Sequence, residues 1–423
     1  MNLVTFLKKT PILVTILIST LLLLQCGGID EQVGKEKSEN SSSAYPRETQ
    51  PVGKTLEDQQ RNAELLSGYE YDKYTTALTG YTGQDLQRIG FTKWEHAVRT
   101  RVGPRGNYKS GFARLPNGKL ILAVCRDNNE TDPAKRRFLI SIYESSDVGL
   151  TWQEINQTPL FGKEPSLTVL PNGTLVMIAQ AGYFGPGAKY DEHPLSRSED
   201  GGRTWETSIH KGDDYPRNII IEPNGSLLMI TAVKPDWEGK GNGSPNLLLS
   251  RSQDNGKTWS HSEGVVDWDW PGFGEVASIR LKDGRLLAAL RRQIPGTTGE
   301  GFEDSFLTES KDDGKTWAKP WQLTTTAQVH AYLTELHDGR LLCTYSNYHV
   351  PFGVSAILST DGGKTWDMDN TIRLSVSNGY YVGWAVTLEL SDHSLITSYA
   401  ATTYREQGQE KFTSEVVRWK MPD

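Results

Sequence analysis

The chain has 423 residues, including 41 Gly, 12 Trp and 17 Tyr, and a formal net charge of −7. This acidic balance argues against nucleic acid as a general partner, because a phosphate backbone attracts basic surfaces. Long helical patterns are nearly absent, so the composition favours an all-β protein of many short strands joined by Gly-rich turns.

Residues 1–26 have the pattern of a targeting segment, which we exclude from the folded domain. Lys8 and Lys9 form its basic end, and an apolar run follows over residues 12–24. The run ends in Leu-Leu-Gln-Cys, which resembles a bacterial lipobox and implies lipid attachment at Cys26. We therefore expect an exported, membrane-anchored lipoprotein, periplasmic or at the cell surface, whose only membrane contact is the lipid. A cleaved signal peptide or a short membrane anchor is the alternative.

Two segments separate this leader from the repeats. Residues 27–55 are rich in Glu, Lys and Ser and have too few apolar residues to bury a core, which predicts a solvated tether. Residues 56–88 have a mixed pattern with one short helix near residues 56–66, and their role is open.

One eight-residue phrase, S-x-D-x-G-x-T-W, recurs every 49 to 58 residues. Its five copies are Ser145–Trp152, Ser198–Trp205, Ser252–Trp259, Ser310–Trp317 and Ser359–Trp366. The Asp can accept bonds from backbone N–H groups inside a tight turn, and the Gly supplies a positive φ. We expect these aspartates to hold turns together, rather than to form a catalytic or calcium-binding array.

A second phrase precedes each copy: an apolar strand, an Asn-Gly or Asp-Gly turn, and another apolar strand. The turn residues are Gly118, Gly173, Gly225, Gly284 and Gly339, with His393 in the sixth copy. Such turns between apolar runs are strong hairpin signals. Each repeat thus predicts four antiparallel strands, and six hairpins predict a six-bladed β-propeller. The last repeat lacks the eight-residue phrase, so we expect residues 89–99 to supply its fourth strand.

The five phrases are Asp boxes, and residues 89–423 resemble the sialidase (neuraminidase) superfamily of β-propellers. The resemblance implies an exo-acting glycosidase. In the family, a Glu nine residues before the fourth hairpin turn serves a tyrosine nucleophile, and an Arg seven residues after the turn belongs to a triad that grips the sialic acid carboxylate. Glu275 and Arg291 match these two spacings.

Other family positions differ in this chain. Lys109 stands in place of the first triad Arg, and residues 351–353 offer no third Arg. Trp384 stands in place of the nucleophilic Tyr, although Tyr381 is close by in the sequence. The loop that carries the family's acid/base Asp offers Asp127 and Asp132 out of convincing register. The resemblance is therefore strong for the fold and partial for the active site.

Counting nine residues back from each hairpin turn gives one position on each first strand, at the mouth of the expected central channel. These positions are Lys109, Glu164, Pro216 (with Arg217 next), Glu275, His330 and Trp384. The ends of the second strands add Arg126, Arg291 and Arg292 to the same face. Propeller mouths are wet and tolerate charge, so a structural explanation exists for each residue alone. The convergence of acids and cations favours a functional site.

Paired carboxylates suggest glycoside hydrolysis. Glu275 beside Arg291 would be the base or nucleophile and Glu164 the acid, with Asp132 as a further catalytic candidate. A terminal sugar that carries an acid or sulfate group would suit the cations. The substrate-binding candidates are Arg291, Lys109, Arg126, Arg217, Arg292, Trp384 and Tyr381.

Three alternatives remain open. The first is a true exo-α-sialidase, and the second is a polysaccharide lyase with His330 or a Tyr as base. The third is a non-catalytic surface propeller that binds glycans.

No Cys/His cluster has the spacing of a metal site, so we expect neither a metal nor a cofactor, and we expect a monomer. Cys125 and Cys343 fall on apolar strands of non-adjacent blades, which favours free buried thiols.

Overall fold

A computed structural model describes residues 56–65, 98–132, 135–181, 192–211, 217–232, 247–261, 263–266, 273–292, 302–377, 379, 382–406 and 409–421. The predicted lipidation site Cys26, the tether, Pro216 and Tyr381 lie outside this set. The expected short helix is present as α1 (Leu56–Leu65). No described helix has both the length and the apolar character needed to span a membrane.

The rest of the described chain is β structure, as the composition predicts, and each hairpin repeat forms one unit of strands. The first two units comprise β2 (Tyr108–Arg114), β3 (Leu120–Asp127), β4 (Phe138–Ser145), β5 (Gln153–Glu154) and β6 (Leu160–Phe161), then β7 (Lys163–Val169), β8 (Leu175–Gln180), β9 (Glu192–Ser198) and β10 (Glu206–Lys211). The third and fourth units comprise β11 (Ile220–Ile221), β12 (Leu227–Ala232), β13 (Leu247–Ser252) and β14 (Glu263–Val266), then β15 (Phe273–Arg280), β16 (Leu286–Arg292), β17 (Asp304–Ser310) and β18 (Trp321–Gln322).

The last two units comprise β19 (Gln328–Glu335), β20 (Leu341–Asn347), β21 (Gly353–Ser359) and β22 (Ile372–Val376), then β23 (Gly383–Glu389), β24 (Leu395–Glu406) and β25 (Gln409–Trp419). Within each unit the strands pair antiparallel in chain order, except that β6 pairs with β4. The fourth and fifth units share one sheet, because Asp304 and Gln328 form a single parallel bridge.

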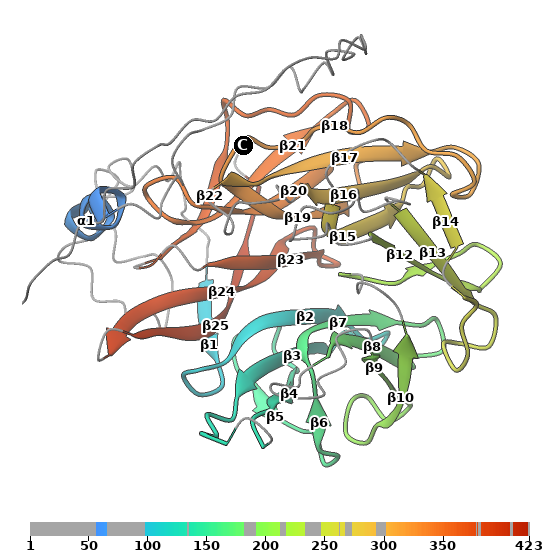
Figure 1. Ribbon diagram of the computed structural model, residues 1–423, viewed down its shortest axis with the longest axis horizontal. Coiled ribbons are helices and arrows are strands. Elements are labelled where there is room, and N and C mark those ends of the chain that lie inside the picture. The colour runs from blue at the N-terminus through green and yellow to red at the C-terminus, as the bar shows by residue number, and fades with distance from the viewer. Residues whose placement is uncertain are drawn as a thin grey trace, which may run out of the picture. The chain divides into compact units, whose positions relative to one another are not determined.

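The sixth unit receives its fourth strand from the start of the domain. Strand β1 (Val98–Val102), which lies beside β24 and β25 in Figure 1, pairs antiparallel with β25. The expected donor was residues 89–99, so the strand begins later in the chain than the sequence pattern indicated. Residues 89–97 lie outside the described set.

The hairpin turns are of the three-residue type, a type I turn followed by a residue in the left-handed region. In the first hairpin, the Gly118 N–H donates to the Leu115 carbonyl and the Leu115 N–H donates to the Lys119 carbonyl. The five turn glycines have φ between 84° and 94°, and His393 has φ 61° at the same place in the sixth. Glycine suits this place because it adopts a positive φ without steric cost.

The Asp boxes hold turns together, as predicted. In the third box, Asp254 accepts hydrogen bonds from the Thr258 N–H (2.9 Å) and hydroxyl (2.6 Å), while the Ser252 hydroxyl accepts the Gly256 N–H at 2.8 Å. The Trp259 indole N–H donates to the Gly256 carbonyl. The other four boxes repeat the Asp–Thr and Ser–Gly bonds.

The buried apolar side chains of the described residues form clusters between neighbouring units. Five clusters each lie mainly between two consecutive units. A sixth contains Phe112 and Leu122 from the first unit and Val386 and Ile396 from the last. The core is therefore divided among the unit interfaces, and one of these joins the two ends of the repeat array.

Cys125 and Cys343 are free and buried, which confirms the prediction from their strand positions. Burial raises the pKa of the Cys125 thiol to about 12 and that of Cys343 even further. Both side chains therefore act as small apolar core residues.

Candidate functional site

The first strands of five units share an unusual backbone feature. One residue in each, nine before the hairpin turn, has a φ between 45° and 58°: Lys109, Glu164, Glu275, His330 and Trp384. At each of these residues the strand pairing skips register, which marks a β-bulge. These are the five described positions of the ring that the hairpin count predicts.

The bulges explain how the strands direct these side chains. A β-bulge inserts one extra residue, increases the local twist and re-aims a side chain. A non-glycine residue in the left-handed region costs on the order of 1–3 kcal/mol, so the surrounding structure must hold it there. Such strain gathers at functional sites, and its recurrence at one register singles out these five residues. The sequence does not predict this positive φ, because none of the five residues is of a type common in turns.

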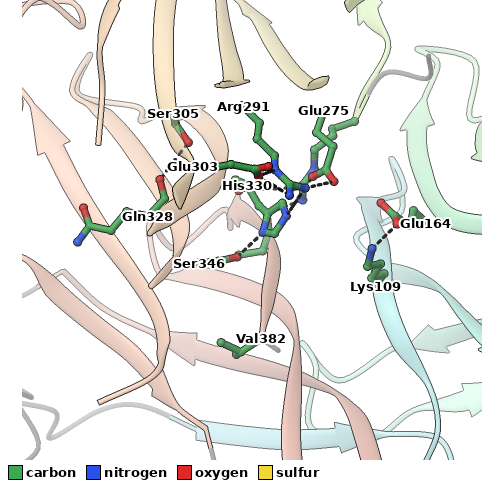
Figure 2. Close-up of polar contacts among 12 residues, drawn as sticks. Lys109, Glu164, Glu275, Arg291, Glu303, Ser305, Gln328, His330, Ser346 and Val382 are labelled. Carbon is green, nitrogen blue, oxygen red and sulfur yellow. Dashed lines mark hydrogen bonds and ion pairs between the residues drawn. The ribbon is translucent and has the colours of Figure 1, made fainter. Parts of the chain in front are cut away.

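Glu275, Arg291 and His330 lie in direct contact, and Glu303 reaches Arg291 from the side opposite Glu275 (Figure 2). Arg291 donates to Glu275 Oε1 at 2.7 Å and to Glu303 Oε2 at 2.5 Å. His330 Nε2 lies 3.1 Å from the Arg291 Nη1 and 3.3 Å from Glu275 Oε2, and its Nδ1 lies 2.8 Å from the Ser346 hydroxyl. Both Glu303 and His330 are fully buried.

These contacts change the interpretation of Arg291. The family resemblance implied that it binds a substrate carboxylate, yet it bonds to Glu275 and Glu303 and is buried. These bonds hold the Glu275 carboxylate in place. Glu303 was missed at the sequence level, because it lies just before β17, where neither the hairpin nor the Asp box marks the register.

A second charged group surrounds Glu164 (Figure 2). The Lys109 amine forms an ion pair with Glu164 Oε1, and the Lys163 amine lies 3.4 Å from the same oxygen. The Lys109 amine also lies 3.9 Å from the centre of the Trp384 ring, a cation–π distance. Lys109, Glu164 and Trp384 are all buried.

Two residues connect the charged groups. The rings of His330 and Trp384 lie 4.5 Å apart between centroids. Arg217 donates to the backbone carbonyls of His330 at 3.3 Å and Ala385 at 3.4 Å. A cavity of about 20 Å³, enough for one water, is lined by Lys109, Ser110, Glu164, Pro165, Ser166, Arg217, Trp384 and Val386. The contacts thus join one connected set from six strand units.

Other predicted site residues do not join these contacts. Arg292 follows Arg291 on β16, so its side chain points to the opposite face, where it bonds to Asp304 at 2.7 and 2.6 Å. Burial raises the pKa of Asp304 to about 6 even though the Arg292 charge opposes this. Asp132 is exposed and lies 3.7 Å from the Lys135 amine. Arg126 is partly buried on β3, and its Nε makes no hydrogen bond within the described chain.

Comparison with known proteins agrees with the Asp boxes. The model of the BNR/Asp-box repeat family matches residues 357–368. A sialidase of Bacteroides fragilis is 27% identical over 55% of this chain and 47% of its own length. A sialidase of Paraclostridium sordellii is 23% identical over 51% of this chain and 59% of its own length. The chain spans about half the length of these curated relatives.

Solved structures with the same fold come from proteins of several functions. A Dyadobacter fermentans protein of unknown function has a TM-score of 0.60 at 21% identity, over 78% of this chain and 99% of its own. The Penicillium chrysogenum α-L-arabinanase, solved with arabinobiose, has a TM-score of 0.54 at 17% identity, over 75% of this chain and 94% of its own. A mutant of the Streptococcus pneumoniae NanB sialidase has a TM-score of 0.55 at 12% identity, over 80% of this chain and 72% of its own. At these identities the likeness shows the fold alone.

Proposed function

We propose that this member of the sialidase-like superfamily is an exo-acting glycoside hydrolase whose carboxylate pair is Glu164 and Glu275. The observation that carries the proposal is the repeated left-handed bulge, which turns both glutamates and His330 toward one set of contacts. Similarity to sialidases and to an arabinanase fold supports the reaction class.

The proposal includes a closed six-bladed propeller. Strand β2 packs against both β7 and β23, β23 packs against β19, and β15 packs against β19 and β12. The Ser166 hydroxyl donates to the Arg217 carbonyl at 2.6 Å, and the Arg217 N–H donates to the Val276 carbonyl at 2.9 Å. These contacts link the second, third and fourth units. They support a ring in which the first strand of every unit faces a common axis.

The number of cations near each carboxylate indicates the roles of Glu164 and Glu275, and it reverses the acid and base roles inferred from the sequence. Two lysine amines face Glu164, which favours its ionised form, so we assign it as nucleophile or base. Glu275 and Glu303 share the single guanidinium of Arg291. Glu164 thus has two lysine partners, whereas Glu275 shares its one arginine with Glu303, and we therefore assign Glu275 as the general acid.

The structure gives less support to a sialic acid substrate than to another terminal sugar. A sialidase grips its substrate carboxylate with arginines that face the substrate, whereas Arg291 bonds to two glutamates. Arg217 lines the cavity, and within the described residues its bonds go to carbonyls, not carboxylates. We propose that its positive charge favours a sugar with an anionic substituent.

A product assay tests the reaction class. The purified protein is incubated with aryl sialosides, aryl arabinofuranosides, aryl uronides and sulfated aryl glycosides, and released aglycone and sugar are measured. Hydrolysis of one terminal sugar is expected. An unsaturated product that absorbs in the ultraviolet would instead show a lyase, and glycan-array binding without consumption would show a binding module.

Export as a lipoprotein with the lipid on Cys26 is a further proposal, which rests on the sequence pattern of residues 1–26. Expression in a bacterial host with labelled fatty acid tests it. We expect label in the membrane fraction for the wild type and none for Cys26→Ser, whereas equal labelling of both would contradict it.

A further inference from the structure

Two histidines and a glutamate meet where the hairpin turns of the fifth and sixth units adjoin. His337 Nδ1 lies 2.5 Å from Glu389 Oε1, and His393 Nδ1 lies 3.8 Å from the same oxygen. The two imidazole rings stack with centroids 3.6 Å apart. Potential ligand atoms of all three side chains lie within 4.8 Å of one another.

The glutamate is held in place by the backbone of the neighbouring turn. Glu389 Oε2 accepts the His337 N–H at 2.7 Å, which leaves Oε1 directed at the two imidazoles. The same bond occurs one unit earlier, where Glu335 Oε2 accepts the Lys282 N–H at 2.9 Å. A glutamate alone therefore suffices to join two adjacent hairpins.

The repeat provides an internal control for the histidines. Lys282 occupies the place of His337 at the earlier junction, and Gly339 occupies the place of His393. The other five hairpins have glycine where His393 adopts φ 61°. A non-glycine residue in this conformation is strained, so the sixth hairpin gives up a favourable residue to present an imidazole beside another. The bond from the His337 N–H to Glu389 does not explain why histidine replaces glycine at position 393.

We propose that His337, Glu389 and His393 bind a divalent transition metal ion of the zinc class. Two imidazoles and one carboxylate are a usual ligand set for Zn²⁺, with water at an open fourth position. Ligand atoms about 2.1 Å from a tetrahedral ion lie about 3.4 Å apart. The two nitrogen-to-Glu389 distances, 2.5 and 3.8 Å, bracket this separation, so a small rotation of the rings completes the site.

The surroundings allow an ion to enter. The His337 and His393 side chains are 49% and 59% exposed, while Glu389 is 15% exposed. They open on a cavity of about 240 Å³, which Asp338 and Asp392, each paired with an arginine, and the cations Arg340 and Lys420 also line. The bound ion would link the fifth unit to the sixth, the unit in which β1 pairs with β25. Sequence spacing predicts no metal site because the two histidines belong to different repeats.

Titration of the full-length chain with Zn²⁺ alone tests the proposal. After treatment with a chelator and removal of any affinity tag, calorimetry is expected to give one ion per chain, and Zn²⁺ is expected to raise the melting temperature. Co²⁺ should give the visible absorption bands of a tetrahedral site. His393→Gly should weaken Zn²⁺ binding at least tenfold and abolish the shift in melting temperature.

The variants separate metal binding from folding. His393→Gly restores the residue that the other hairpins use, so it should melt at the same temperature as the metal-free wild type or higher. His337→Ala provides a second ligand deletion. Glu335→Gln, which alters the corresponding glutamate bond at the preceding junction, should leave Zn²⁺ affinity unchanged. Absence of binding by the wild type, or equal affinity in His393→Gly, would overturn the proposal.

Discussion

Because His330 has a left-handed backbone, we predict that glycine is more stable than alanine at this position, the reverse of the order at an ordinary strand residue. We compare His330→Ala with His330→Gly, both of which remove the same fully buried ring and its contacts with Arg291 and Ser346. The difference between the two variants therefore isolates the backbone. The residue has φ 58° at a bulge of β19.

The expected magnitude follows from two opposing effects. Glycine in an ordinary strand is less stable than alanine by about 0.5–1 kcal/mol, because it loses more conformational freedom on folding. In the left-handed region the alanine Cβ costs about 1–2 kcal/mol, which reverses the order. We expect His330→Gly to be more stable than His330→Ala by about 1 kcal/mol. At the neighbouring Ala331, whose φ is not positive, Ala331→Gly should destabilise.

Urea unfolding followed by tryptophan fluorescence measures these differences as shifts in the midpoint at constant slope. If the backbone at His330 is strained, glycine must be more stable than alanine at residue 330 and less stable than alanine at residue 331. If His330→Gly is less stable than His330→Ala, the bulge stores no strain at this residue. The repeated feature at the five ring positions would then lose its energetic meaning.

Three further predictions concern other parts of the molecule. The threonine of its Asp box lowers the pKa of Asp254 to about 2 through side-chain and backbone hydrogen bonds, so its contribution to stability is present above about pH 4 and lost as the pH falls through 2. Asp254→Asn should therefore lower the urea midpoint at pH 7, and a difference that persists undiminished at pH 2 would contradict this. Because burial raises the pKa of Cys125 to about 12 and that of Cys343 further, neither thiol should react with a disulfide reagent at pH 8 until the domain unfolds. Fast labelling of the native protein at either cysteine would refute their buried position. Glu303→Gln weakens charge-assisted bonds to Arg291 in a buried site and should lower the free energy of unfolding by about 2 kcal/mol, and an unchanged urea midpoint would show that the pair contributes nothing.

The sequence predicted the positions of the ring because the hairpin turn is a fixed register mark. Nine residues separate Lys109 from Gly118 and Glu275 from Gly284, and the structure keeps that spacing in the five units where the ring position is described. The fold class and the Asp-box turns follow from the same regularity. Repeats make such counting reliable, because one physical solution is used several times.

The partners within the site could not be read in the same way. Arg291 could face a ligand or a neighbouring carboxylate, and only the fold reveals Glu303 at its other side. The positive φ values were also hidden, because Lys, Glu, His and Trp are not residues typical of that conformation. Packing from neighbouring units enforces it, and a pattern within one unit cannot report that packing.

The turnover of Glu275→Gln, relative to the wild type on whichever terminal glycoside is cleaved, tests the central claim most directly. We predict a loss of at least about 100-fold in a variant that still unfolds cooperatively, because it keeps the shape of the side chain but cannot transfer a proton. The exposed Glu206→Gln serves as a control and should retain full activity. Wild-type turnover by Glu275→Gln would remove this residue from the mechanism and leave the ring of bulges without a catalytic role.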